Sequence, residues 1–122
     1  MFKYIDHVAV HCSDLGRSER FYAEAFGFEA FSHHERPGGG IVYMRLGDSV
    51  LELTEKPKEP MSGMHFAVET DDMEAAVRHL AAVGAEMIQE PRPLRAKRPG
   101  EGETRRAVYC GPDGEMIEVR GT

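Results

Sequence analysis

Short runs of alternating or clustered apolar residues predict β-strands along the whole chain. They lie at residues 4–12, 29–35, 41–46, 49–55, 64–70, 85–89, 104–110 and 115–120. Two further segments place apolar residues at spacings of three and four, the pattern of an amphipathic helix. We expect these helices between Asp14 and Gly27 and between Asp72 and Gly84. Aspartate is a good N-cap, and glycine readily ends a helix.

The two halves of the chain repeat one another. His7-Val-Ala-Val opens the first half, and His65-Phe-Ala-Val opens the second. Each half continues with a predicted helix and closes on an apolar strand that carries a single glutamate, Glu52 or Glu118. The repeat therefore supplies one histidine and one glutamate from equivalent strands of each half.

Each half reads β-α-β-β-β, which gives module one at residues 1–56 and module two at residues 62–122. A short linker containing prolines, residues 56–60, joins them. In module two we expect a Pro/Arg/Gly loop to shorten or displace the strand at 85–89. Because one sheet with one helix leaves a face bare, we predict a single α+β domain. Its two paired modules would form a curved sheet around a cavity that binds a metal.

His7, Glu52, His65 and Glu118 are the candidate metal ligands. Residues two apart on a strand share a face, so small neighbours such as Ala9 leave room beside the histidine. A carboxylate enclosed on the inner face needs a cation. Two imidazoles and two carboxylates suit a divalent Ni, Zn, Co, Mn or Fe ion. Taken singly, each residue is more often a surface or hydrogen-bonded residue, and the repeat is what favours a site.

Composition limits the kinds of partner. The 122 residues are 41% hydrophobic and 30% charged with a net charge of −6, which disfavours nucleic-acid binding. No apolar run has the roughly 20 residues that a membrane span needs. The N-terminus begins directly in a strand pattern and not in a signal peptide, so we expect a cytoplasmic protein that binds a small molecule.

Two local features remain open. Arginines, lysine, prolines and glycines crowd residues 92–102, which predicts a loop that is either solvated and mobile or closes over an anionic ligand. Cys12 and Cys110 have no CxxC partners, so we expect two reduced thiols. A disulfide between them has no support in the sequence.

The whole chain resembles the vicinal oxygen chelate superfamily, which includes glyoxalase I, methylmalonyl-CoA epimerase, extradiol dioxygenases and fosfomycin-resistance enzymes. The resemblance lies in these motifs: His7-Val-Ala-Val with Asp14-Leu15, Phe21-Tyr22 before Gly27-Phe28, Leu51-Glu52-Leu53, His65-Phe-Ala-Val with Asp71-Asp72, and Pro112-Asp-Gly114 before Ile117-Glu118-Val119. As an indication of fold these motifs are strong. As an indication of substrate they are weak, because the fold hosts many chemistries.

The resemblance implies a ligand set and a reaction class. Members similar to glyoxalase I use His, Glu, His and Glu, which His7, Glu52, His65 and Glu118 match. Epimerases usually have Gln at the position of Glu52, and dioxygenases and fosfomycin enzymes normally lack that fourth ligand. A metal-dependent lyase or isomerase is therefore implied, acting on a small α-oxo or α-hydroxy carbonyl compound or its thiol conjugate. Glu118 would be the catalytic base, with Glu52 as its counterpart for the opposite stereochemistry.

Other residues depart from the family or remain open. Bacterial glyoxalases that use glutathione have arginine and asparagine where this chain has His11 and Lys56, which puts glutathione in doubt. His11 either contacts substrate, donates a hydrogen bond that supports a metal ligand, or is a solvated residue at a strand end. Arg105 or its neighbour Arg106 could bind a carboxylate or phosphate, and we predict Arg105, in phase with Tyr109, as substrate-binding. The alternative is an exposed charge at the edge of the loop.

Three other readings stay open from the resemblance. The protein could be a dioxygenase or an antibiotic-modifying thiol transferase. It could also be a binding protein without catalysis, similar to bleomycin-resistance proteins, although these generally lack the four ligands. Relatives often build the site across a homodimer, which we expect here, but the sequence does not choose between sites within one chain and across two.

Overall fold

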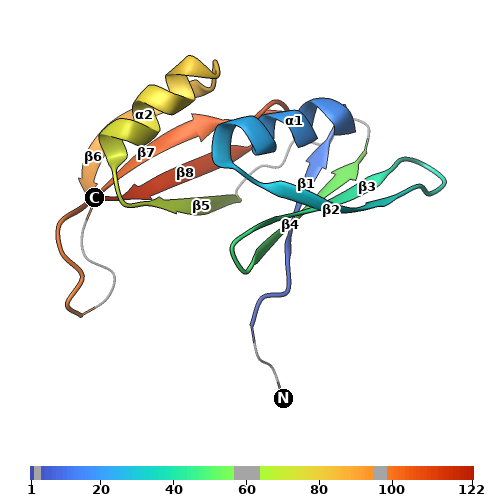
Figure 1. Ribbon diagram of the computed structural model, residues 1–122, viewed down its shortest axis with the longest axis horizontal. Coiled ribbons are helices and arrows are strands. Elements are labelled where there is room, and N and C mark those ends of the chain that lie inside the picture. The colour runs from blue at the N-terminus through green and yellow to red at the C-terminus, as the bar shows by residue number, and fades with distance from the viewer. Residues whose placement is uncertain (2–3, 57–63, 95–98) are drawn as a thin grey trace. The chain divides into compact units, whose positions relative to one another are not determined.

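The computed structural model describes residues 1, 4–56, 64–94 and 99–122 (Figure 1). The chain divides into two compact units, Met1–Ser62 and Gly63–Thr122. Each unit contains one helix and a four-stranded sheet, so the α+β class is confirmed. Residues 57–60 of the predicted linker and residues 95–98 of the basic loop lie outside the described residues.

The first unit contains β1 (Val8–Cys12), α1 (Leu15–Phe26), β2 (Glu29–His34), β3 (Ile41–Leu46) and β4 (Ser49–Glu55). Its strands lie in the order β1-β4-β3-β2. The β1–β4 pair is parallel, and the other two pairs are antiparallel. The helix that follows β1 is therefore a crossover, and it brings the first strand beside the last.

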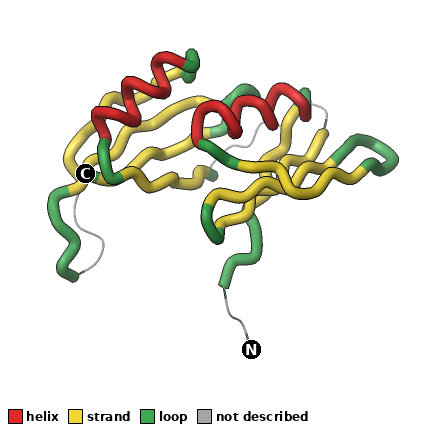
Figure 2. Tube along the Cα trace, viewed as in Figure 1, coloured by secondary structure: helices red, strands yellow, loops and turns green. Residues whose placement is uncertain are grey.

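The second unit repeats this topology with β5 (His65–Thr70), α2 (Met73–Ala82), β6 (Glu86–Leu94), β7 (Thr104–Cys110) and β8 (Met116–Gly121). Its order is β5-β8-β7-β6, again with one parallel pair between the first and last strands (Figure 1). Figure 2 marks the helices in red and the strands in yellow. The predicted β-α-β-β-β order is thus confirmed in both halves.

Both helices begin at the predicted aspartates. Asp14 Oδ1 accepts a hydrogen bond from the Arg17 amide at 2.9 Å, and Asp72 Oδ1 accepts one from the Ala75 amide at 2.8 Å. Gly27 follows the first helix with a φ of 78°, in the left-handed region that glycine adopts at little cost. The two aspartate caps therefore fix where both helices begin, and Gly27 fixes where α1 ends.

The apolar core lies between each helix and its sheet. In the first unit Tyr22 of α1 and Leu53 of β4 are fully buried, and α1 contacts β4. In the second, Leu80 of α2 and Ile117 of β8 are buried, and α2 contacts β8. Since side chains alternate along a strand, the glutamates beside Leu53 and Ile117 face away from the helices.

Two predicted strand boundaries were wrong by several residues, and others differ by a single residue. The first strand begins at Val8 and not at residue 4, so His7 precedes it. The sixth extends to Leu94 and is not shortened by the loop. It is an edge strand whose register shifts between Met87 and Gln89 and between Gln89 and Arg92. Edge strands and bulges tolerate proline, which explains how β6 includes two.

The remaining structural expectations concern the cysteines and the membrane. Among the described residues, no disulfide joins Cys12 or Cys110, in agreement with the two reduced thiols expected. Burial raises the pKa of the Cys110 thiol, and the nearby Glu86 and Glu115 carboxylates add to this. In the described part of the chain, no helix has both the length and the apolar character needed to cross a membrane.

Candidate functional site

Strand register places a histidine and a glutamate on one face of each sheet. Ala9 of β1 pairs with Glu52 of β4, and Ala67 of β5 pairs with Glu118 of β8. His65 lies two residues before Ala67 and shares that face, while His7 lies two residues before Ala9. In each unit the predicted histidine and glutamate therefore come together on the side of the sheet opposite the helix.

In the first unit, hydrogen-bonding groups surround the pair. His7 Nε2 lies 3.0 Å from Glu52 Oε2, and His7 Nδ1 lies 2.9 Å from Asp6 Oδ2. The Thr54 hydroxyl donates to Glu52 Oε1 at 2.7 Å, and Tyr43 also hydrogen bonds Glu52. Both oxygens of Glu52 are thus engaged by the protein, which holds this carboxylate in one orientation.

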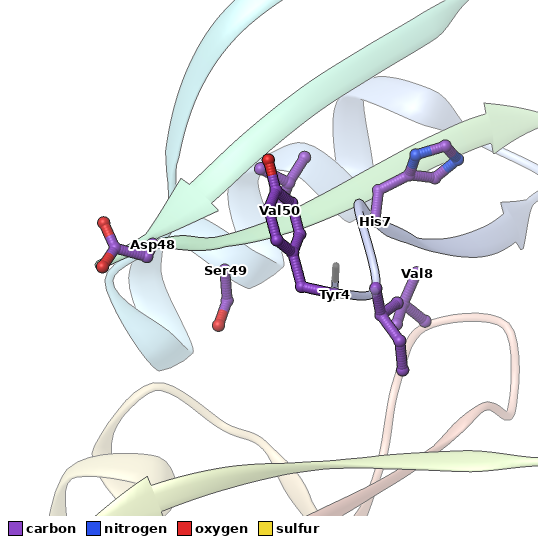
Figure 3. A pocket seen from close by; sticks show the side chains of 7 residues that line it. Tyr4, His7, Val8, Asp48, Ser49 and Val50 are labelled. Carbon is purple, nitrogen blue, oxygen red and sulfur yellow. The ribbon is translucent and has the colours of Figure 1, made fainter. Parts of the chain in front are cut away.

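The same groups shift two pKa values. The hydrogen bond to Asp6, and to a lesser extent the charges of Glu52 and Asp6, raise the pKa of His7 against an opposing effect of burial. Burial first, and then the Glu52 carboxylate, raise the pKa of Tyr43. His7 also borders a pocket of about 670 Å³ within the first unit (Figure 3).

In the second unit the glutamate is more deeply buried and less completely paired. Glu118 is 3% exposed. Its Oε2 lies 3.4 Å from both His65 Nε2 and Arg106 Nη1. Its Oε1 is buried and has no hydrogen-bond partner among the described residues. A buried carboxylate oxygen without a hydrogen-bond partner lowers the stability of the folded protein. Glu118 is therefore suited to receive a cation or a proton.

The predicted substrate-binding residues divide between the two faces. His11 pairs with Thr54 and so shares the face of Glu52. Tyr109 pairs with Ile117 and is buried on the helix side of its sheet. Arg105 also lies on the helix side of the sheet. The geometry therefore does not support the substrate-binding role predicted for Arg105 and Tyr109.

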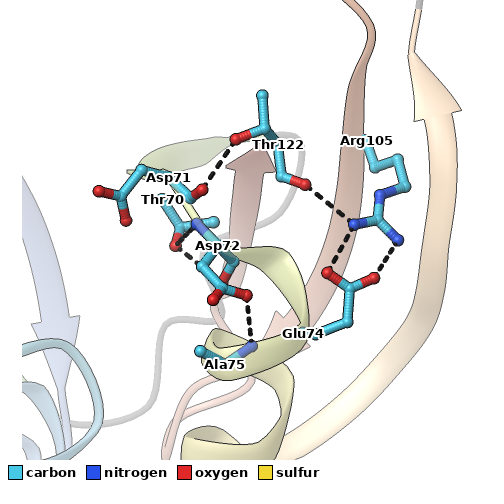
Figure 4. A network of polar contacts seen from close by, with 7 residues as sticks. All are labelled: Thr70, Asp71, Asp72, Glu74, Ala75, Arg105 and Thr122. Carbon is cyan, nitrogen blue, oxygen red and sulfur yellow. Dashed lines mark hydrogen bonds and ion pairs between the residues drawn. The ribbon is translucent and has the colours of Figure 1, made fainter.

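Arg105 has a different partner in the structure. It forms an ion pair of 2.6 Å with Glu74 of α2 and donates to the Thr122 carbonyl at 2.9 Å (Figure 4). These contacts occupy its guanidinium at the start of the helix. The arginine that reaches Glu118 is instead Arg106, because successive residues of a strand point to opposite faces.

Reasoning from the sequence missed the residues that support the pairs. Thr54 lies two positions after Glu52, a spacing that could have indicated a shared face. Asp6, directly before His7, could have indicated a hydrogen bond to its ring. The choice of Arg106 depends on the register of β7 against β8, which no local pattern specifies.

The chemistry of the donors fits a divalent cation. Imidazole and carboxylate groups are ligands for Ni, Zn, Co, Mn and Fe, and the buried Oε1 of Glu118 has no hydrogen-bond partner among the described residues. A carboxylate on the second ring nitrogen, as Asp6 provides for His7, commonly orients a metal-binding histidine. The described residues contain no group of three or more His, Cys, Asp or Glu side chains gathered as a metal site. Each unit therefore holds one His–Glu pair, His7 with Glu52 and His65 with Glu118.

Comparisons with known proteins agree with the fold. A probable lactoylglutathione lyase from Vibrio parahaemolyticus is 27% identical over 124 residues, which cover 93% of this chain and 86% of that protein. A lactoylglutathione lyase from Arabidopsis thaliana is 28% identical, and this chain spans 42% of its length. The crystal structure of a glyoxalase family protein from Enterococcus faecalis superposes with a TM-score of 0.74 at 26% identity and 98% coverage of both chains.

A family model covers nearly the whole chain. It matches residues 4–119, a range that includes both His–Glu pairs and both helices. The family's description names proteins that catalyse reactions and proteins that confer resistance. The chain belongs to the Glyoxalase/Bleomycin resistance protein/Dioxygenase superfamily.

Proposed function

We propose that this protein is a metal-dependent lyase or isomerase for a small α-oxo or α-hydroxy carbonyl compound or its thiol conjugate. His7, Glu52, His65 and Glu118 would together hold one divalent cation. The observation that carries the proposal is the buried Glu118, whose Oε1 has no hydrogen-bond partner among the described residues. The lactoylglutathione lyases among the relatives support the reaction class.

The two glutamates have different surroundings and therefore different proposed roles. Glu52 accepts hydrogen bonds from Thr54 and Tyr43, which suits a fixed ligand. Glu118 has one unengaged oxygen in a buried setting, which suits a group that takes and returns a proton. We assign Glu118 as the catalytic base and Glu52 as the group positioned for the opposite stereochemistry.

A bound divalent cation would supply Lewis acidity that makes the C–H bond beside a carbonyl easier to ionise. Asp6 would accept the Nδ1 proton of His7, which leaves Nε2 free to act as a ligand. Glu118 Oε1 would take the proton from one carbon and return it to the neighbouring carbon. His11 shares the face of Glu52 and is proposed to contact the substrate.

Exchange of solvent deuterium into candidate substrates, followed by NMR, tests the proton transfer. The panel should include hemithioacetals of methylglyoxal with several thiols, because His11 and Lys56 make glutathione uncertain. Wild type loaded with Ni or Zn should catalyse exchange. Glu118→Gln should lower the rate by about 10²- to 10⁴-fold, the usual contribution of a general base.

The control separates loss of the base from loss of structure. Glu103→Gln changes an exposed carboxylate elsewhere in the second unit and should leave exchange unchanged. Equal rates for wild type and Glu118→Gln would remove the assignment of the base. Oxygen uptake with the Fe(II)-loaded protein would favour a dioxygenase. Tight binding of a bleomycin-like compound without turnover would favour a resistance protein.

A homodimer in the cytoplasm remains part of the proposal. Light scattering coupled to size-exclusion chromatography measures the mass of the assembly directly. A mass of two chains would agree with the proposal, and a mass of one chain at all concentrations would contradict the dimer.

A further inference from the structure

Three arginines lie side by side across the second sheet, on the face that carries Glu118. Register pairs Arg92 of β6 with Arg106 of β7, and Arg106 with Arg120 of β8. Like charges directly opposite one another on paired strands destabilise a sheet unless anions compensate them. Arg120 has such an anion, Glu101, at 2.6 Å.

Arg106 is held less firmly than Arg105 and Arg120. Its Nη1 lies 3.4 Å from Glu118 Oε2, and its Nη2 lies 3.3 Å from Gln89 Oε1. Charge-assisted hydrogen bonds between a guanidinium and a carboxylate are normally about 2.7–2.9 Å long. The pairs of Arg105 and Arg120 are that short or shorter, at 2.6 Å. Arg106 therefore retains donors that can turn toward an incoming anion.

A pocket of about 470 Å³ lies beside this arginine, within the second unit. Arg92 and Arg106 line it together with three apolar side chains, Ile88, Val108 and Met116. Ile88 is 56% exposed and Met116 is 47% exposed, which is high for residues of this type. The pocket thus combines two guanidinium groups with an accessible apolar wall.

We propose that Arg92 and Arg106 bind the carboxylate of a small 2-oxo or 2-hydroxy acid whose short apolar chain packs on Ile88 and Met116. Two planar guanidinium groups suit the two oxygens of a carboxylate. A dianionic phosphate is less suitable, because Glu90 lines the pocket and Glu118 touches Arg106. This inference rests on the proposed function, which gives the substrate class as small α-oxo or α-hydroxy carbonyl compounds. The arginine site narrows that class to carboxylic acids.

Binding of 4-methyl-2-oxopentanoate to the full chain tests the inference. The titration is followed by NMR shifts of the arginine Nε–H groups and the backbone amides, with EDTA present so that no metal takes part. Wild type should bind the acid, with the largest shifts at Arg106, Arg92 and β6. Arg106→Gln should weaken binding by about tenfold or more, since it removes the donors that meet the carboxylate.

Arg105→Gln is the matched control, since Arg105 is the next residue along β7 and lies on the opposite face. It should bind the acid within about twofold of wild type, because its guanidinium does not line the pocket. Equal weakening in both variants would overturn the inference, as would tighter binding of inorganic phosphate or of the neutral amide. Arg106→Lys should retain part of the affinity, which shows that the fold persists.

The two proposals can fail separately. If the metal-loaded protein catalyses proton exchange but no variant alters acid binding, only the arginine site is wrong. If the acid binds through Arg106 and no metal-dependent exchange occurs, the proposed function is wrong and the arginine site stands.

Discussion

The glutamates of the two His–Glu pairs differ in their hydrogen-bond partners. Glu52 and Glu118 occupy equivalent positions in the two repeats, yet Thr54 engages one and Arg106 approaches the other. Position in the repeat predicted that both would be inward-facing carboxylates. It could not predict their partners, because those come from neighbouring strands.

Asp6 is expected to strengthen metal binding through His7. Its carboxylate accepts the Nδ1 proton at 2.9 Å and fixes the ring. Asp6→Asn should lower the affinity for Ni or Zn by about 10- to 100-fold, the usual effect of removing such a partner. Competition against a chelating dye measures this affinity.

Asp48→Asn provides the control for that experiment. Asp48 lines the same pocket as His7 and, like Asp6, is exposed. Its substitution should leave metal affinity unchanged. Equal losses in the two variants would point to a general effect of charge and not to orientation of the ring.

At the scale of the elements, the succession of strands and helices along the chain and the starts of both helices followed from local pattern, whereas strand length did not. The apolar face of each helix and its aspartate cap predicted both helices correctly. The prolines near residue 92 suggested a loop, but β6 lies at the sheet edge, where missing amide donors cost little. Edge position is a property of the sheet order and is not visible in the segment itself.

The Glu74–Arg105 ion pair joins α2 to β7, and it predicts a pH-dependent stability. The hydrogen bond from Arg105 lowers the pKa of Glu74 in the folded protein. The stabilisation is therefore complete above the ordinary pKa of about 4.5 and is lost as the pH falls through the lower folded value. Glu74→Gln should reduce the Tm at neutral pH, and the difference from wild type should disappear in acid.

Glu103→Gln is the control variant. It removes one negative charge from an exposed glutamate and leaves the Glu74–Arg105 ion pair in place. It should shift the Tm little at either pH. A Tm difference for Glu74→Gln that persists unchanged at the lowest pH would mean that the ion pair is not its cause.

The junction of β5 and β8 depends on a glycine. Gly121 has a φ of 148°, and a Cβ there would overlap the Thr70 carbonyl oxygen. Gly121→Ala should lower the free energy of unfolding by about 2 kcal/mol or more, through backbone strain and the clash. Urea denaturation measures this change.

Gly102→Ala is the matched control. A Cβ at Gly102 would meet no atom within 4 Å, and the expected change is within about 0.5 kcal/mol. If Gly121→Ala changed the free energy of unfolding as little as Gly102→Ala, Gly121 of β8 would not lie as close to Thr70 of β5 as it does in the structure.

At the scale of the whole molecule, the repeat explains why two units of similar topology exist in one chain. Each unit supplies a histidine and a glutamate on the face opposite its helix, and neither supplies more than half of the proposed ligand set. The sequence predicted this division from the two His-x-Ala-Val segments. It did not predict the arginine row of the second unit, which depends on register between three strands.

The stoichiometry of metal binding by purified wild type and by single-ligand variants, measured by calorimetry with Ni and Zn, tests the proposed four-residue site directly. We predict one ion per chain for wild type. His7→Ala in the first unit and His65→Ala in the second should each lower the affinity severely, because both units contribute to one site. Wild type that binds no divalent ion, or variants of one unit that retain full affinity, would contradict the proposed four-residue site.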